Sequence, residues 1–247
     1  GKGMSAAIAD YNDDGQIDIF VTNDSERNFL FRNVKGKYFQ EVAVEAAVAF
    51  TEDGIPVSSM GLDFRDLNND GRPDVTITAL ANETYPLFIN ENSEVFVDET
   101  YQARVGLPSN TMSGWGNGAF DFDGDGWKDI FTANSHVSEN LELYRQQKYK
   151  LPNALFQNLG DGTFESVGKQ AGLLASAAHR GAAFGDLNGD GRIDVVVSVI
   201  GEPAEILYNM STPERHWIQL LISGSNSNRD AIGTKIKLTT RSGAVQH

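Results

Sequence analysis

The chain has 247 residues, 34 acidic against 20 basic side chains, a formal net charge of −14 at pH 7 and no cysteine. Because phosphate recognition needs clustered Lys and Arg, so negative a chain argues against a nucleic-acid partner. The lack of cysteine excludes disulfides, zinc–thiolate centres and cysteine nucleophiles. No stretch approaches the roughly 20 apolar residues of a membrane-spanning helix. The first residues carry no signal-peptide pattern and enter structured-looking sequence at once, so we expect both ends to belong to something longer.

One nine-residue pattern recurs along the chain and predicts its organisation. Small or apolar residues precede each copy, a β-rich run follows it, and a short apolar segment ending in Asn comes next. The pattern reads DYNDDGQID at 10–18, DLNNDGRPD at 66–74, DFDGDGWKD at 121–129 and DLNGDGRID at 186–194. The Asn-ended segments are LFRN at 30–33, LFIN at 87–90, LFQN at 155–158 and ILYN at 206–209. In three copies a further apolar run follows, around Phe39, Phe96 and Phe164.

About four short strands per repeat, with turn residues between them and no helical period, predict an all-β fold. A unit of that size cannot bury its faces alone and must stack on its neighbours, which favours a β-propeller with four visible repeats. The last Asp of the pattern precedes the landmark Asn by 15, 16, 29 and 15 residues in the four copies. The third repeat therefore carries an insertion of 13 to 14 residues (29−16 and 29−15), which we place between Asn134 and Asn153.

The nine-residue pattern places oxygen-bearing side chains at the spacing of a calcium loop. Asp or Asn at positions 1, 3 and 5 puts three oxygens on one side of a tight turn, Gly at position 6 permits the backbone to reverse, and Asp at position 9 closes the cage. The expected side-chain ligands are Asp10, Asn12, Asp14, Asp18, Asp66, Asn68, Asp70, Asp74, Asp121, Asp123, Asp125, Asp129, Asp186, Asn188, Asp190 and Asp194. The position-7 residues, which would contribute only their carbonyls, are Gln16, Arg72, Trp127 and Arg192. We therefore expect up to four Ca²⁺ ions.

The charge of these loops supports bound cations. The loops contain 3+3+4+3 = 13 of the 34 acidic side chains, and removing them leaves 21 acids against 20 bases. An EF-hand is excluded because position 12 falls inside a β-rich run and is never Glu. The residues at that position are Val21, Ile77, Thr132 and Val197. The alternative is four Asn/Asp-Gly hairpin turns without metal, which four copies of one ligand spacing disfavour.

These repeats resemble the FG-GAP/VCBS repeats of integrin-like propellers, in which such loops join neighbouring strands of a blade and bind Ca²⁺. The segments 134–137, 180–183 and 216–238 narrow the resemblance to the ASPIC/UnbV (cartilage acidic protein-like) family, although Asn134-Ser135-His136 stands where that family usually has Asn-Gly-His. The resemblance implies a secreted or surface-exposed protein with roughly seven blades before the ASPIC/UnbV segment. We therefore expect propeller repeats over 1–212 and the beginning of that small β segment over 213–247. A closed four-bladed ring is the alternative.

A ligand-binding face is expected opposite the calcium loops. If the strands of a blade alternate in direction, the connections from strand 2 to strand 3 and from strand 4 to the next blade share that face. The insertion 134–153 and the segment 108–117 are such connections, and they carry aromatic and basic side chains suited to a protein or glycan. The expected rim residues are Trp115, His136, Tyr144, Arg145, Lys148 and Tyr149. The alternative is a solvated loop over 134–153 that packs on a neighbouring blade.

The sequence favours a calcium-stabilised, non-catalytic binding, adhesion or scaffold module located outside the cell, on its surface or in the periplasm. None of the four histidines, His136, His179, His216 and His247, pairs with a nucleophile in a known local signature. Two other functions stay open. A polysaccharide-active lyase or hydrolase would show a catalytic cluster on the inner rim, whereas a subunit of a surface assembly would show exposed strand edges or an apolar patch.

Overall fold

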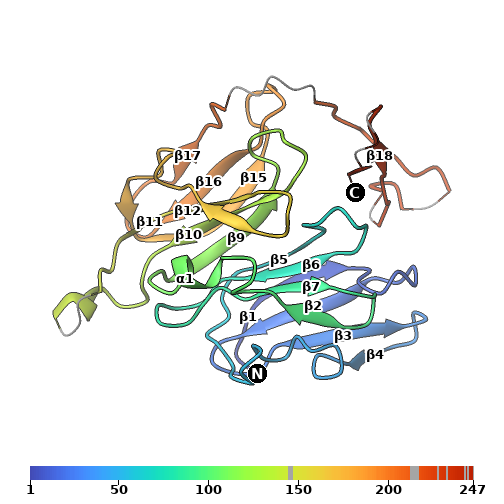
Figure 1. Ribbon diagram of the computed structural model, residues 1–247, viewed down its shortest axis with the longest axis horizontal. Coiled ribbons are helices and arrows are strands. Elements are labelled where there is room, and N and C mark those ends of the chain that lie inside the picture. Colours follow the sequence, from blue (N-terminus) through green and yellow to red (C-terminus); the bar gives the residue numbers. More distant parts are fainter. Residues whose placement is uncertain are drawn as a thin grey trace.

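The computed structural model describes residues 1–143, 147–211, 217–226, 228–231, 233–241, 243 and 245–246. The described chain is built of β-strands and carries two short helical segments, α1 (Gly106–Ser109) and the 3₁₀ turn η1 (Glu139–Leu143). Four antiparallel sheets follow one another along the chain in a propeller arrangement, and we call them blades 1 to 4 (Figure 1). The predicted all-β propeller fold is confirmed.

Each blade is a meander in which every strand pairs with the next strand of that blade. The strands of blade 1 are β1 (Gly3–Ala9), β2 (Asp18–Asn23), β3 (Phe29–Val34) and β4 (Tyr38–Glu41). Those of blade 2 are β5 (Leu62–Arg65), β6 (Asp74–Ile77), β7 (Leu87–Asn90) and β8 (Phe96–Asp98). Blade 3 contains β9 (Gly114–Phe120), β10 (Asp129–Asn134), β12 (Ala154–Asn158) and β13 (Phe164–Ser166). Blade 4 contains β15 (His179–Gly185), β16 (Asp194–Val199) and β17 (Glu205–Leu207).

Two further strand pairs lie outside the blades. The insertion of the third repeat contains η1 and ends in β11 (Leu151–Pro152), which pairs with β14 (Ser176–Ala177). Near the end of the chain, β18 (Leu238–Thr239) pairs with β19 (Val245–Gln246). The expected division of the chain at 212/213 stays a prediction.

The core of the molecule lies between the blades rather than within them. Aromatic side chains dominate two of the boundaries, with the rings of Phe20 and Phe64 6.1 Å apart between blades 1 and 2. Between blades 3 and 4, the rings of Phe131 and Phe184 are 5.9 Å apart. The first strands of neighbouring blades approach so closely that a Cβ atom on Gly118 would lie 2.2 Å from the Phe184 ring. Stacking of blades therefore buries the apolar faces, as the repeat pattern predicted.

In repeats 2 to 4 the landmark Asn joins its blade to the preceding one. The side-chain amides of Asn90, Asn158 and Asn209 donate to main-chain carbonyls of the blade before, at 2.8, 3.0 and 2.7 Å. The acceptor in every case is the second residue of the preceding nine-residue pattern: Tyr11, Leu67 and Phe122. The same hydrogen bond therefore links each pair of successive blades.

The first residue of the fourth strand forms a second repeated contact between blades. The amide of Phe96 donates to the carbonyl of Ala46 at 3.0 Å, and the amide of Phe164 donates to that of Ala103 at 2.9 Å. Both phenyl rings are buried against the preceding blade, with 2% and 4% of the residue exposed. The fourth strand therefore supplies an apolar plug to the neighbouring blade.

The outer faces of blades 1 and 4 lack these contacts. Phe39 occupies the position of Phe96 and Phe164 but is 49% exposed, and Ile8 on β1 is 59% exposed whereas its counterpart Phe64 is 8% exposed. On blade 4, Leu187 is 51% exposed, whereas its three counterparts in the earlier loops are buried. These exposed faces contradict a closed four-bladed ring, in which blades 1 and 4 would bury one another. The roughly seven-bladed ring stays a prediction.

Candidate metal centres

The four nine-residue loops, numbered 1 to 4 in chain order, each connect the first strand of a blade to the second. Loops 2 and 3 lie side by side, since the Asn69 side chain donates to the Gly126 carbonyl at 2.9 Å. Position 4 has positive φ in every loop, and so does the glycine at position 6, from 81° at Gly15 to 94° at Gly126. Glycine adopts that conformation without steric cost, which explains the residue pattern.

The Asp at position 1 closes each loop around its own backbone. Its two carboxylate oxygens accept hydrogen bonds from the amides of positions 5 and 6, at 2.8 to 3.2 Å in all four loops. These residues are Asp10, Asp66, Asp121 and Asp186. These bonds wrap the loop backbone around the position-1 carboxylate, and the ligand role of positions 1, 3 and 5 stays a prediction.

The Asp at position 9 has a second function that the sequence analysis did not recognise. One of its oxygens accepts from the amide of position 2 and the other from the amide of the landmark Asn, at 2.8 to 3.2 Å throughout. The carboxylates that make these bonds are Asp18, Asp74, Asp129 and Asp194, all fully buried. The spacing of 15 or 16 residues between position 9 and the landmark Asn in repeats 1, 2 and 4 was a signal that could have revealed this link between loop and third strand.

Burial disfavours the ionised form of several of these carboxylates. Desolvation raises the pKa of Asp18 to about 6 and the pKa of both Asp74 and Asp129 to about 7, against the lowering effect of the backbone hydrogen bonds. It also raises the pKa of Asp121. A cation in the loop would favour the ionised forms, since an opposite charge nearby lowers the pKa of a carboxyl group.

Loop 3 has the geometry that fits a metal ion best. Asp121, Asp123 and Asp129 each offer an oxygen, and the three oxygens lie within 4.8 Å of one another. Within the ranges that the structure describes, this is the one cluster of three acidic or histidine side chains with such spacing. In loop 1 the buried side-chain oxygen of Asn12, a predicted ligand, accepts no hydrogen bond. Carboxylate and amide oxygens are hard ligands of the kind Ca²⁺ takes, so these residues fit that ion.

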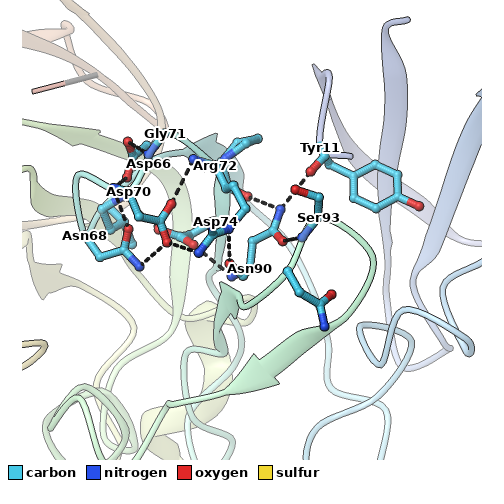
Figure 2. Close-up of polar contacts among 12 residues, drawn as sticks. Tyr11, Asp66, Asn68, Asp70, Gly71, Arg72, Asp74, Asn90 and Ser93 are labelled. Carbon is cyan, nitrogen blue, oxygen red and sulfur yellow. Dashed lines mark hydrogen bonds and ion pairs between the residues drawn. The ribbon is translucent and has the colours of Figure 1, made fainter. Parts of the chain in front are cut away.

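Loops 2 and 4 contain a charge arrangement that the sequence analysis missed. The position-7 side chains were expected to play no part, but Arg72 contacts the Asp70 carboxylate at 2.5 Å and donates to the Asn90 carbonyl at 2.8 Å (Figure 2). Arg192 makes the same two contacts in loop 4, with Asp190 and with the Asn209 carbonyl. These arginines neutralise part of the loop charge, whereas position 7 of loop 3 is the uncharged Trp127.

A lysine from the end of the chain lies at loop 1. The ammonium group of Lys235 is 3.4 Å from the carboxylate of Asp10 and also bonds Asp13. Lys235 is about half exposed, so this ion pair is screened by solvent. Loop 1 therefore has a cationic side chain beside its position-1 carboxylate, whereas loops 2 and 4 have one beside position 5.

The structure brings part of the expected ligand rim together around Arg180. The guanidinium carbon of Arg180 lies 4.2 Å from the Trp115 ring centre and 6.0 Å from that of Tyr149. Arg180 also donates to the carbonyls of His136 and His179, at 3.2 and 2.8 Å. Lys148 is exposed, and Tyr144 and Arg145 lie outside the described residues. The sequence predicted no rim role for Arg180, because residues 180–183 entered only through the family resemblance.

A cavity of about 330 Å³ adjoins this cluster on the first strands of the blades. Its lining includes Met4, Met60, Trp115, Asn117 and Arg180. The connections around it are fastened to one another, for example by the Trp115 indole nitrogen, which donates to the Ser135 carbonyl at 2.7 Å. The insertion therefore packs on its neighbours through its ends.

The two histidines that the structure describes form hydrogen bonds with neighbouring connections. His179 is fully buried; its Nδ1 lies 3.1 and 3.0 Å from the carbonyls of Asn134 and Leu151, and its Nε2 lies 3.1 Å from the Glu205 carboxylate. The Nδ1 atom of His136 accepts from the Ser138 amide at 3.3 Å. His216 and His247 lie outside the described residues.

Comparison with known proteins agrees with this architecture. A family model described as FG-GAP-like repeat matches residues 10–77, 66–132 and 121–197, so each matched window starts at the first Asp of a loop. This chain belongs to the FG-GAP-like repeat family. The family places the nine-residue loop at the start of each repeat and the second strand of the next blade at its end.

Three curated relatives carry the name cartilage acidic protein 1, from Xenopus tropicalis, Homo sapiens and Mus musculus. The chain is 26% identical to the Xenopus tropicalis protein over 260 aligned residues, covering 96% of this chain and 36% of that protein. It is 34% identical to the Homo sapiens protein over 88 residues, covering 35% of this chain and 12% of that one. The chain therefore spans about a third of the length of the Xenopus tropicalis protein. The predicted family resemblance is confirmed.

Among solved structures, a Bacillus licheniformis rhamnogalacturonan lyase aligns with 85% of this chain and 41% of its own, at 11% identity and a TM-score of 0.46. Similarity at this level carries no argument about activity. Within the described ranges, no helix is both long enough and apolar enough to cross a membrane.

Proposed function

We propose that this chain is a calcium-stabilised extracellular binding or scaffold module. The observation that carries the proposal is the group of three carboxylates in loop 3, with Asp129 buried and its pKa raised to about 7 by desolvation. A Ca²⁺ ion held by Asp121, Asp123 and Asp129 would supply the missing positive charge. Loops 1, 2 and 4 share its backbone geometry and are proposed as further calcium sites.

The proposed location follows from calcium concentration. A site contributes RT ln(1 + [Ca]/Kd), so about 1 mM calcium with a Kd of about 10⁻⁴ M adds about 1.4 kcal/mol of stability. Several such contributions are comparable with the stability of a whole domain. Cytosolic calcium is far too dilute for sites of that affinity. The name of the relatives, cartilage acidic protein 1, also associates them with an extracellular tissue.

We propose the face opposite the calcium loops as the binding face, for a protein or a glycan. The cavity of about 330 Å³ with Trp115 and Arg180 on its wall supports this placement. An aromatic ring and a guanidinium group side by side are the residue types that dominate binding energy at interfaces. The role is proposed as non-catalytic, since the contacts of His179 and His136 hold connections in place.

Thermal unfolding with and without calcium tests the proposal. Millimolar calcium, added after treatment with EDTA, is expected to raise the Tm more than the same concentration of magnesium does, and metal analysis of the native protein should find bound calcium. Asp123→Ala should reduce the calcium-dependent rise. Asp123→Asn should retain most of it, because Asn stands at that position in the other three loops. Asp53→Asn, an exposed acid outside the loops, is the control for net charge.

The proposal would be refuted if calcium did not change the Tm and metal analysis found no metal bound to the protein. A shift that Asp53→Asn reduces as much as Asp123→Ala does would assign the effect to overall charge instead of loop 3.

A further inference from the structure

In the described part of the chain, three arginines lie over an aromatic ring, and two of them also bind a carboxylate. The two complete sets are Arg27, Phe29 and Glu41, and Arg65, Phe120 and Asp63. The guanidinium carbons are 4.8 and 4.1 Å from the ring centres, and the carboxylates are 2.6 and 2.9 Å from a guanidinium nitrogen. A ring and a carboxylate together are therefore how this protein accommodates a stacked arginine.

The third arginine, Arg180, has the ring without the carboxylate. Its guanidinium carbon lies 4.2 Å from the Trp115 ring centre, and its nitrogens donate to the carbonyls of His136 and His179. These acceptors carry no formal charge, so they fix the guanidinium without neutralising it. Burial lowers the pKa of Arg180 against the raising effect of Tyr149, and no described carboxylate takes part. A half-buried cation without a counter-ion is unfavourable, and a bound anion would relieve it.

Arg180 lies in the wall of the cavity of about 330 Å³ on the first strands of the blades. Among the described residues that line this cavity, Arg180 is the one with a charged side chain. The Trp115 ring and the side chains of Met4 and Met60 give the wall an apolar part. The cavity therefore combines one cation with an apolar surface.

This cavity lies far from the acidic loops. Its lining comes from the beginnings of the first strands, whereas the loops follow the ends of those strands. Along β15, six residues (186−180) separate Arg180 from Asp186, which is about 20 Å of extended chain. Charges are largely screened beyond about 8–10 Å at physiological salt. The acidic loops therefore do little to repel an anion in the cavity.

We propose that this cavity binds a uronic acid unit of an acidic glycan, with Arg180 as the residue that selects its carboxylate. The inference rests on the proposed binding role of this face. The sugar carboxylate takes the place at Arg180 that Glu41 and Asp63 hold at Arg27 and Arg65. The fork of N–H groups on an arginine matches the two oxygens of a carboxylate and gives a strong, directional contact.

A sugar acid fits the cavity better than an acidic peptide. A volume of about 330 Å³ is at the lower end of small-molecule sites, and it suits one ring-sized group. A glutamate side chain would bring two methylene groups beside its carboxylate and leave most of that volume unfilled. The C–H groups of a sugar ring pack on the Trp115 ring and on the adaptable side chains of Met4 and Met60.

The probes are glucuronate and galacturonate, each matched with its uncharged methyl ester. Titration at fixed calcium, followed by the NMR signal of the Trp115 indole N–H, should show saturable binding of at least one acid, at least about tenfold tighter than its ester. Arg180→Gln keeps a donor for the carbonyls but loses the charge, and it should remove this preference. Arg65→Gln removes the same charge from a stacked arginine that has its own carboxylate, and it should bind as the parent does.

Thermal unfolding should show that both variants are folded. Equal affinity for acid and ester, no saturable binding of either acid at tens of millimolar, or a preference that survives Arg180→Gln would overturn the inference. Acetate that binds as tightly as the uronates would show that the site recognises the anion alone, and tighter binding of N-acetylglutamate amide would favour an acidic protein; each result would overturn the sugar assignment. Because the calcium-dependent rise in Tm is measured separately, loss of uronate binding with that rise intact would overturn this inference and leave the calcium proposal standing.

Discussion

Replacing Asn90 by Ala tests whether the landmark Asn fastens one blade to the next. Asn90 is fully buried, and its amide donates to the carbonyls of Tyr11 at 2.8 Å and Pro73 at 3.3 Å (Figure 2). Its side-chain oxygen accepts from the Ser93 amide at 2.9 Å. Each lost bond costs about 1 kcal/mol net, and a buried carbonyl left without a donor costs about 1–3 kcal/mol. We expect Asn90→Ala to lower the free energy of unfolding by about 4 kcal/mol.

Blade 1 supplies a matched control. Asn33 makes the two local contacts, to the Ile17 carbonyl at 3.3 Å and from the Gly36 amide at 2.9 Å, but its side chain is only half-buried and makes no described bond to another blade. Asn33→Ala should therefore cost about 2 kcal/mol less than Asn90→Ala. Asn158→Ala, which loses a 3.0 Å bond to the Leu67 carbonyl, should match Asn90→Ala.

Urea unfolding at fixed saturating calcium, followed by intrinsic fluorescence and by circular dichroism, measures these differences. Calcium is held constant so that a change in metal affinity does not enter the comparison. If Asn33→Ala and Asn90→Ala destabilise the protein equally, within about 0.5 kcal/mol, the bond between blades contributes nothing and the reasoning is wrong.

Two of three further predictions use the same unfolding assay. Phe96→Ala should cost about 3–5 kcal/mol, whereas Phe39→Ala, at the half-exposed counterpart, should cost less than about 1 kcal/mol; similar costs would contradict the plug role. Gly118→Ala should destabilise by about 1–3 kcal/mol because its new methyl group meets a phenyl ring; a neutral result would mean that the first strands separate easily.

The third concerns pH in calcium-free buffer. Burial raises the folded-state pKa of Asp74 and Asp129 to about 7, above the unfolded value of about 3.8, so the folded state binds more protons between these limits. The contribution of these groups to stability should therefore fall as pH rises from about 4 to about 7, and calcium should remove that dependence. A fall in stability that is equally steep with calcium bound would show that other groups cause it.

Much of the loop geometry could be predicted from the sequence because it is local. The bonds that close loop 2 around the Asp66 carboxylate join residues within five positions of each other, as in the bond from the Gly71 amide to Asp66. The turn needs Gly at position 6 for the same local reason, since its φ is positive. The neutralisation of Asp70 by Arg72 was not predicted, because position 7 specifies a backbone carbonyl and leaves the direction of its side chain open.

The sequence by itself determined the repeat, the strand order within a blade and the positions of the acidic loops, since these depend on residues close together in the chain. Only the tertiary structure decided what each repeated residue contacts. Asn90 bonds a carbonyl 79 positions away, which no local pattern reveals. Phe39 and Phe96 hold the same place in their repeats, yet one is exposed and the other buried. The physical reason is that the burial of a side chain depends on whether a neighbouring blade covers its face of the sheet. That is decided only when the blades pack together.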